Sequence, residues 1–219
     1  MQLSRNLIVA TRNNGKFREF ASLFEPLGIA VKSLNDVSNA PEIAEDGDTF
    51  SANALKKART IAETFGTLAL ADDSGLCVDA LDGRPGVYSA RFAGEGGKDA
   101  DNNAKLLAEL NRLHDQGKLK TETVQIEGQR ASLLSPAKFV CALALADPNG
   151  QSLMVEADCR GYVIDQPFGG NGFGYDPLFY IPEFGMTMAQ LSPNEKNRIS
   201  HRAQALIKLR EKLKSAPIT

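Results

Sequence analysis

The chain has 219 residues, a length that suits one domain, and 42% of them are hydrophobic, which is enough for a buried core. Its formal net charge of −2 argues against a polynucleotide partner, because binding a phosphate backbone requires clustered excess Lys and Arg. A small anionic ligand is still compatible with this charge, since it needs only a local positive pocket. We therefore expect one domain over residues 1–219, built as two lobes.

The cysteines and the apolar runs indicate a cytoplasmic protein. There are 3 Cys, and none has the close spacing of a zinc site. Cys77 and Cys141 lie in apolar runs, where Cys usually acts as a small hydrophobic residue, so we expect no disulfide framework. No segment approaches the ~18 apolar residues of a membrane helix, and the N-terminus lacks the apolar stretch of a signal peptide. We expect no membrane partner.

The N-terminal part predicts a strand, a polar loop and a helix. Leu7 to Ala10 is an apolar run typical of a buried strand. Apolar residues then recur at helical spacing from Phe17, and Gly28 is placed to end that helix. A second strand is expected at 29–34. A strand, a tight polar loop and a helix together place a phosphate at the helix N-terminus.

An acidic loop, a helix and a third strand follow. Residues 42–48 are acidic and show no apolar periodicity. Asp48 or Thr49 is expected to cap a helix that ends at Gly66. Residues 67–71 predict a buried strand that stops before the next acidic pair.

The middle of the chain is less regular. Residues 79–97 are rich in Gly, Pro and Asp, and they predict a structured loop with one short helix. A helix is expected at 101–113. Residues 117–136 are polar and weakly patterned, and we expect a flexible excursion there.

The second half predicts an antiparallel portion. Strands are expected at 138–146, 152–157 and 160–165, and the turn Asp147-Pro-Asn-Gly150 joins the first two. Later, Ser192-Pro-Asn-Glu195 matches a capping box ahead of a terminal amphipathic helix. This alternation of strands and helices indicates an α/β fold.

The loop from Thr11 to Lys16 suits phosphate oxygens. It offers backbone N–H groups at a helix N-terminus, a hydroxyl, amide side chains and a lysine. It is not a Walker A loop, because Ala10 stands where the first Gly belongs and Phe17 replaces the Ser or Thr that binds Mg²⁺. The alternative is a turn capped by Asn13 or Asn14, with the lysine merely solvated.

Carboxylates after the third strand suit a divalent ion. Asp72 and Asp73 follow a buried strand, where α/β sheets usually build ligand crevices. Side chains alternate along a strand, so one Asp should face the crevice and the other should point away. Glu45 in the acidic loop supplies another carboxylate, and Mg²⁺ prefers one or two carboxylates with phosphate oxygens and waters. The alternatives are that Asp72 and Asp73 are only turn residues and that the acidic loop with Glu45 is only solvated.

Two later segments suit a nucleoside. In Phe173-Gly-Tyr-Asp-Pro-Leu-Phe179, glycines let backbone approach a flat ligand and an aromatic ring can stack on a base, although such loops often only pack a hairpin end. Lys196, His201 and Arg202 supply donors, although each also suits a solvated helix face. In one ideal helix Lys196 lies about 140° from His201, so either they contact different parts of a ligand or the helix bends near Ser200.

These segments, in this order, resemble the inosine/xanthosine triphosphate pyrophosphatases, the Ham1-like family. The resemblance covers nearly the whole chain. Residues 117–135 look longer than is typical, which bears on loop structure and dimer contacts. The motifs that carry it are Thr11, Asn13 and Lys16, then Glu45-Asp-Gly-Asp-Thr-Phe50 with Asn53, then Ala71-Asp-Asp-Ser-Gly-Leu76, Pro85-Gly-Val-Tyr-Ser-Ala-Arg91, Phe173-Gly-Tyr-Asp176 and Ser200-His-Arg202.

The resemblance implies an elongated mixed β-sheet flanked by helices, with two lobes and a central cleft, usually as a homodimer. It implies Mg²⁺-dependent hydrolysis of ITP, dITP and XTP to the monophosphate and pyrophosphate, which removes deaminated purines from the nucleotide pool. It makes Lys16 and Asp73 catalytic. It assigns the triphosphate to Thr11, Arg12, Asn13, Asn14, Gly15 and Lys16, the nucleoside to Ser74, Phe173, Gly174, Tyr175, Asp176, Lys196, His201 and Arg202, and the metal to Glu45 and Asp73.

Base selection follows from donors and acceptors. Hypoxanthine and xanthine present O6 as an acceptor, whereas adenine presents an amino donor, and an unpaired buried polar group costs about 1–3 kcal/mol. Rival hypotheses are a pyrophosphatase for another modified nucleotide and a non-catalytic nucleotide-binding module. A Rossmann oxidoreductase is disfavoured, because no Gly-x-Gly-x-x-Gly follows the first strand.

Overall fold

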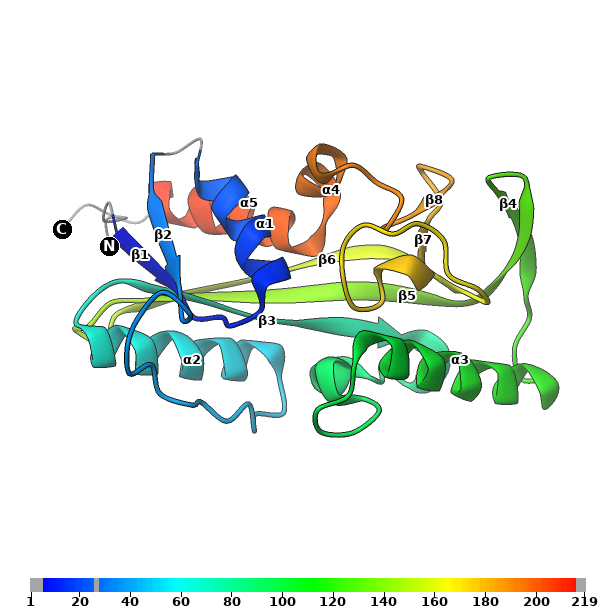
Figure 1. Cartoon of the computed structure of the whole chain (residues 1–219), viewed down its shortest axis with the longest axis horizontal. Helices are drawn as coiled ribbons and strands as arrows, with labels where there is room; N and C mark the ends of the chain where they lie inside the picture. The colour runs from blue at the N-terminus through cyan, green and yellow to red at the C-terminus, as the bar shows by residue number, and fades with distance from the viewer. Residues whose placement is uncertain (1–5, 26–27, 216–219) are drawn as a thin grey trace. The chain divides into compact units, whose positions relative to one another are not determined.

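The computed structural model of the chain describes residues 6–25 and 28–215 (Figure 1). Within those residues, eight strands form one sheet in the order β2-β1-β3-β5-β6-β7-β8, and β4 pairs with β5. The strand β1 is parallel to β2 and β3, whereas β4–β5, β6–β7 and β7–β8 are antiparallel pairs. The predicted α/β class with a mixed sheet flanked by helices is confirmed. The strands are β1 (Asn6–Val9), β2 (Ala30–Ser33), β3 (Ala69–Val78), β4 (Glu122–Ile126), β5 (Gln129–Ala146), β6 (Ser152–Ile164), β7 (Phe179–Ile181) and β8 (Met186–Thr187).

The helices are α1 (Asn14–Phe24), α2 (Phe50–Phe65), α3 (Asp99–Asp115), α4 (Pro193–Ile199) and α5 (His201–Ser215). Short 3₁₀ helices cover Asp79–Leu81, Gly86–Arg91 and Asp176–Leu178. Among the described residues, no helix is both long and apolar enough to span a membrane.

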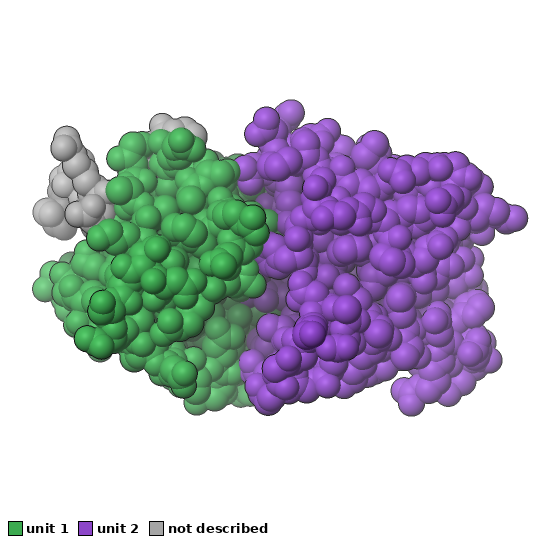
Figure 2. Space-filling view, viewed as in Figure 1, with its two compact units in different colours: residues 1–73, 141–157, 201–219 green, residues 74–140, 158–200 purple. Residues whose placement is uncertain are grey.

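Two compact units make up the chain, and Figure 2 colours them separately. Unit 1 comprises residues 1–73, 141–157 and 201–219, and unit 2 comprises residues 74–140 and 158–200. Three strands, β3, β5 and β6, have residues in both units. Whether the chain is one domain, as expected from its length, stays a prediction.

In unit 1, helices cover both faces of the strands, with α1 and α5 on one face and α2 on the other (Figure 1). The strands bury both faces because alternate side chains point to opposite sides. The alternation divides the buried apolar side chains of β3 in this unit between two apolar clusters, one on each face of the sheet. Leu70 packs with α1 and α5, whereas Ala69 and Ala71 pack with α2. The same alternation along β3 sets the directions of the next two side chains, which are both acidic.

The helix boundaries in unit 1 follow local chemistry. The side chains of Asn13 and Thr49 accept hydrogen bonds from the first turns of α1 and α2, and Gly66 ends α2 in the left-handed conformation, at φ 59°. The predicted end of α1 at Gly28 is wrong. The helix ends at Phe24, and Glu25 follows it with right-handed dihedrals. Gly28 does adopt a positive φ of 67°, but it does so in the turn before β2.

In unit 2, α3 packs against the apolar core. Leu106 and Leu110 of this helix pack in a core that includes Phe139 and Phe179, whose ring centroids are 4.6 Å apart. The capping box at Ser192 and Glu195 forms as predicted, and it starts α4.

The prediction of a flexible excursion at 117–136 is wrong, because this segment forms the β4–β5 hairpin. Ile126 pairs with Gln129 across a two-residue loop, and Glu127 and Gly128 both have positive φ, at 51° and 77°. Such loops match the natural twist of paired strands. Ile126, Ala131 and Leu133 bury the apolar side of the hairpin. In this segment the apolar residues are few and stand between polar ones, so the sequence pattern of the two half-buried strands is weak.

Several strand predictions are too short. The predicted strands at 152–157 and 160–165 form one strand, β6. Likewise β3 continues past Ala71 to Val78, so Asp72 and Asp73 lie within the strand instead of following it. Acidic residues are unfavourable in a buried strand unless they are paired, and the pairing comes from cations on neighbouring helices.

Candidate active site

The loop between β1 and α1 is held by its own side chains. Oδ1 of Asn13 accepts from the backbone N–H of Lys16 at 3.0 Å, and Oγ1 of Thr11 accepts from the N–H of Asn13 at 3.1 Å. The carbonyl of Thr11 also accepts from Leu34, next to β2. The predicted alternative, a capped turn with a solvated lysine, is therefore correct in its first part, because Asn13 caps the turn. It is wrong for Lys16, whose side chain is ion-paired rather than merely solvated.

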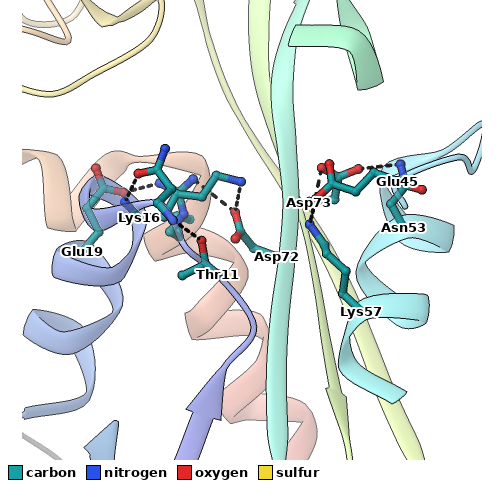
Figure 3. A network of polar contacts seen from close by, with 10 residues as sticks. Thr11, Lys16, Glu19, Glu45, Asn53, Lys57, Asp72 and Asp73 are labelled. Atoms are coloured by element: carbon teal, nitrogen blue, oxygen red, sulfur yellow. Dashed lines mark hydrogen bonds and ion pairs between the residues drawn. The ribbon is translucent and has the colours of Figure 1, made fainter. Parts of the chain in front are cut away.

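Asp72 lies in a charge network on the face of β3 that α1 and α5 cover (Figure 3). Its Oδ2 atom is 3.0 Å from Nζ of Lys16 and 3.3 Å from a guanidinium nitrogen of Arg202. The same guanidinium pairs with Glu19 of α1, and the Arg202 side chain is fully buried. Two cations thus face two carboxylates, and the network ties α1, β3 and α5 together.

The charges around Asp72 keep it ionised. Burial by itself raises the pKa of this carboxyl group, but the nearby cations Lys16, Arg202 and Lys57 outweigh burial and hold the pKa well below its usual range. A carboxylate with so low a pKa is a poor proton acceptor near neutral pH. Asp72 is therefore suited to orient Lys16 rather than to accept a proton.

Asp73 points to the opposite face of β3, toward α2 (Figure 3). Its Oδ2 accepts from Nδ2 of Asn53 at 2.9 Å, and its Oδ1 is 4.0 Å from Nζ of Lys57. Lys57 also donates to Oε1 of Glu45 at 2.6 Å. Asn53 in turn binds the backbone of Gly47, in the same acidic loop as Glu45. One helix therefore holds the acidic loop and the strand carboxylate together.

The environment of Asp73 raises its pKa. Burial is the largest influence, and the repulsion by Glu45 adds to it, so that the opposing effects of Lys57 and the Asn53 hydrogen bond do not cancel the rise. For Lys57, burial alone lowers the pKa, but the charges of Asp72, Glu45 and Asp73 raise it overall. The lysine is therefore an ammonium ion beside a carboxylate that accepts protons more readily than an ordinary aspartate.

The aromatic loop in unit 2 is anchored by Asp176. Its Oδ2 accepts from the backbone N–H of Phe173 at 3.0 Å and from Nζ of Lys196 at 2.7 Å. The Lys196 ammonium also lies 5.0 Å from the centroid of the Phe173 ring, in a cation–π arrangement. Both Asp176 and Lys196 are buried. Three of the residues predicted to contact the nucleoside are thus brought together.

Other parts of unit 2 hold the same loop. Asp99 and Asn103 of α3 bind the backbone N–H and the carbonyl of Gly174, at 2.7 and 3.0 Å. The hydroxyl of Tyr175, which is buried, donates to the carbonyl of Ser89 at 2.9 Å. The loop is consequently held by hydrogen bonds to α3 and to Ser89.

The residues near Asp73 fit a divalent ion. Glu45 and Asp73 both approach one ammonium ion, so their oxygens already gather round a positive charge. Two hard carboxylates that face one cation suit Mg²⁺, which completes its shell with phosphate oxygens and waters. Among residues 6–25 and 28–215, no group of three or more His, Cys, Asp and Glu side chains is placed to hold a metal.

Comparison with known proteins identifies the family. The sequence model of the Ham1 family matches residues 7–212. The chain belongs to the Ham1 family. A relative from Geobacillus kaustophilus, named dITP/XTP pyrophosphatase, is 52% identical over 207 residues, which cover 94% of this chain and 93% of the relative. A relative of the same name from Bacillus cereus is 46% identical over 216 residues, which cover 97% of each chain.

Solved structures of the Ham1 family agree with the fold. The HAM1 protein from Coxiella burnetii superposes with a TM-score of 0.78 at 38% identity, covering 96% of this chain and 99% of that one. The Staphylococcus aureus Ham1 protein gives 0.76 at 34% identity, covering 97% of this chain and 100% of that one. The likeness therefore spans both compact units.

The remaining predicted residues of this Ham1 family member fall at separate places. Ser74 is half-buried on β3, and His201 is buried as the first residue of α5. Ser200 has an extended ψ of 151°, so α4 stops before His201. Of the two alternatives for Lys196 and His201, the break of the terminal helix near Ser200 is therefore the one that the structure shows. Arg12 and Asn14 are exposed beside the capped loop.

Sequence reasoning missed Lys57 and Glu19, and gave Asn53 no role of its own. The sequence signal that points to these residues is their spacing along a helix. Asn53 and Lys57 are four residues apart on α2, and Lys16 and Glu19 are three apart on α1, so each pair lies on one face of its helix. A lysine on the apolar side of α2 should have indicated a buried acidic partner, because lysine is almost never fully buried unless paired.

Proposed function

We propose that this Ham1 family member hydrolyses ITP, dITP and XTP to the nucleoside monophosphate and pyrophosphate. One observation carries the hydrolytic part: Asp73 is a fixed, mostly buried carboxylate with a raised pKa, beside a second carboxylate and a lysine. The relatives that match nearly the whole chain are named dITP/XTP pyrophosphatases, and these names support the choice of substrate.

In the proposed mechanism, Asp73 accepts a proton from a water molecule. The water oxygen forms a bond to the α-phosphorus, the bond from that phosphorus to the bridging oxygen breaks, and pyrophosphate leaves. The raised pKa of Asp73 favours this proton transfer, because a stronger base is the better acceptor. Asn53 holds the carboxylate by one oxygen and so orients the other.

The triphosphate is proposed to bind the loop between β1 and α1. The N-terminus of α1 favours negative charge, and Lys16 adds an ammonium whose direction is fixed by Asp72. Glu45 and Asp73 would hold Mg²⁺, which when bound neutralises the charge of the phosphate oxygens. Positioning and neutralisation of charge account for most catalysis of phosphoryl transfer.

The nucleoside is proposed to contact Phe173–Asp176, Lys196, His201, Arg202 and Ser74. The anchored aromatic loop offers the ring of Phe173 for stacking, and Lys196 offers a donor for O6 of hypoxanthine or xanthine. Adenine presents an amino donor at that position, which would face the donating lysine and could not accept from it. Such a mismatch costs about 1–3 kcal/mol, which is about fivefold to more than a hundredfold in rate.

The test is pyrophosphate release from ITP, XTP, ATP, GTP and dTTP, with and without Mg²⁺. We expect Mg²⁺-dependent release from ITP and XTP and at least about fivefold less from ATP. Equal turnover of ATP and ITP would remove the base-selection argument, and a preference for dTTP would favour a pyrophosphatase for another nucleotide. Tight ITP binding without any pyrophosphate release would instead indicate a binding module.

The family resemblance also supports a homodimer that works in the cytoplasm. Light scattering of the purified chain tests the first point, since a dimer has twice the 23.6 kDa mass of one chain. Fractionation of cells that express it at natural levels tests the second.

A further inference from the structure

Lys57 is a buried lysine between two carboxylates. It lies on α2 with 7% of its surface exposed, and its Nζ atom is 2.6 Å from Glu45 and 4.0 Å from Asp73. Its neighbour Lys56 provides a contrast, because it pairs with Asp46 in solvent, with side chains 44% and 69% exposed. An exposed pair contributes little, whereas a buried charge that loses its partner is costly.

The two carboxylates require a cation near them. Glu45 and Asp73 are like charges that share one ammonium, and each raises the energy of the other when no cation is present. The protein supplies that cation from its own chain.

We propose that Lys57 is a built-in counter-ion that competes with the divalent metal for Glu45 and Asp73. Without nucleotide, the lysine neutralises these carboxylates and keeps their affinity for the metal low. With nucleotide, the phosphates add oxygen ligands and negative charge, so the carboxylates accept the metal beside the ammonium. The metal therefore binds tightly only together with the nucleotide. This inference rests on the proposed role of Glu45 and Asp73 as metal ligands.

The direct test measures metal binding without nucleotide. Free Mn²⁺ is followed by electron paramagnetic resonance as it is titrated into the wild-type chain, Lys57→Met, Lys57→Gln and Lys56→Met. Removing one charge from a buried pair should tighten Mn²⁺ binding by about tenfold or more in both Lys57 variants. The Lys56→Met variant, altered one residue away on the same helix, should bind Mn²⁺ like the wild type.

Two further measurements locate the effect. Adding Glu45→Gln to Lys57→Met should abolish the gain, because the second carboxylate is then lost. Thermal unfolding without nucleotide should show that Mg²⁺ raises the Tm of Lys57→Met more than that of the wild type. A Lys57→Met chain that folds only with metal supports the proposal too, since the metal then replaces the ammonium.

The proposal is overturned if both Lys57 variants bind Mn²⁺ no tighter than the wild type, or if Glu45→Gln leaves the gain intact. Failure of the proposed function has a different signature. A chain that shows the Lys57 effect but releases no pyrophosphate from any nucleotide loses the proposed hydrolysis and keeps the counter-ion. A chain that hydrolyses ITP but shows no change in Mn²⁺ binding in the Lys57 variants keeps the proposed hydrolysis and loses the counter-ion.

Discussion

Asp72 and Asp73 are neighbours in the sequence, yet their carboxylates lie on opposite faces of β3 and contact different side chains (Figure 3). Asp72 faces two strong cations, Lys16 and Arg202, which hold its pKa well below the usual range. The pKa of Asp73 is raised, first by burial and then by the carboxylate of Glu45, although Lys57 and Lys16 oppose the rise. The geometry of one strand thus gives two identical side chains different chemistry.

The first prediction concerns the proposed base. Asp73→Asn should lower kcat for ITP by about 10²- to 10⁴-fold, because the amide cannot accept the proton of the attacking water. Steady-state pyrophosphate release measures this, with circular dichroism to check the fold. The matched control is Asp46→Asn, which alters an exposed ion pair and should keep full activity. An Asp73→Asn chain that folds and retains wild-type turnover would show that another group is the base.

The second prediction concerns stability. Asp72→Asn should destabilise the fold by about 3–5 kcal/mol, because it leaves buried Arg202 and Lys16 without their shared carboxylate. Urea unfolding at neutral pH measures the change. Asp158→Asn, in a 4.0 Å surface pair with Arg160, serves as the control and should change stability by less than about 1 kcal/mol. A loss as small as that of the control would mean that the buried network contributes little.

The third prediction concerns acid. The folded pKa of Asp72 is depressed, so its contribution to stability is complete above the unfolded value of about 3.9 and is lost as pH falls below that value. The Tm of the wild type should therefore fall more steeply than that of Asp72→Asn between about pH 4 and pH 2.5. Differential scanning calorimetry across this range measures both slopes. Parallel curves would exclude Asp72 as a source of acid sensitivity.

The fourth prediction concerns the aromatic loop. Gly172 has φ 84°, and a Cβ added there meets the carboxylate of Asp176 and lies 3.2 Å from Nζ of Lys196. Gly172→Ala should therefore cost about 1–2 kcal/mol in strain alone, and it should raise the KM for ITP by displacing the Asp176–Lys196 pair. Gly170→Ala is the matched control, since a Cβ there has nothing within 4 Å. Equal KM values for the two variants would contradict a role of this pair in binding.

Local patterns explain which parts of the fold are predictable. Helix caps depend only on residues within one helical turn, so they can be predicted from the sequence. The predicted helix boundaries at Asn13, Thr49, Gly66 and Ser192 accordingly lie at helix ends in the structure. The β4–β5 hairpin depends instead on Ile126 and Leu133 packing against Phe168 and Tyr180, which lie far along the chain. No local window contains those partners, so the polar segment was predicted to be flexible.

The sequence by itself determined the family motifs, the α/β class and most candidate site residues, because capping, periodicity and motif order are local properties. Only the tertiary structure decided that β3 runs through the acidic pair, that Asp72 faces Lys16 and Arg202 whereas Asp73 faces Asn53, and that Lys57 stands between Asp73 and Glu45. The physical reason is that the pKa of a carboxyl group depends on burial and on charges within a few ångströms. Those charges come from α1, α2 and α5, which meet β3 only after the chain has folded.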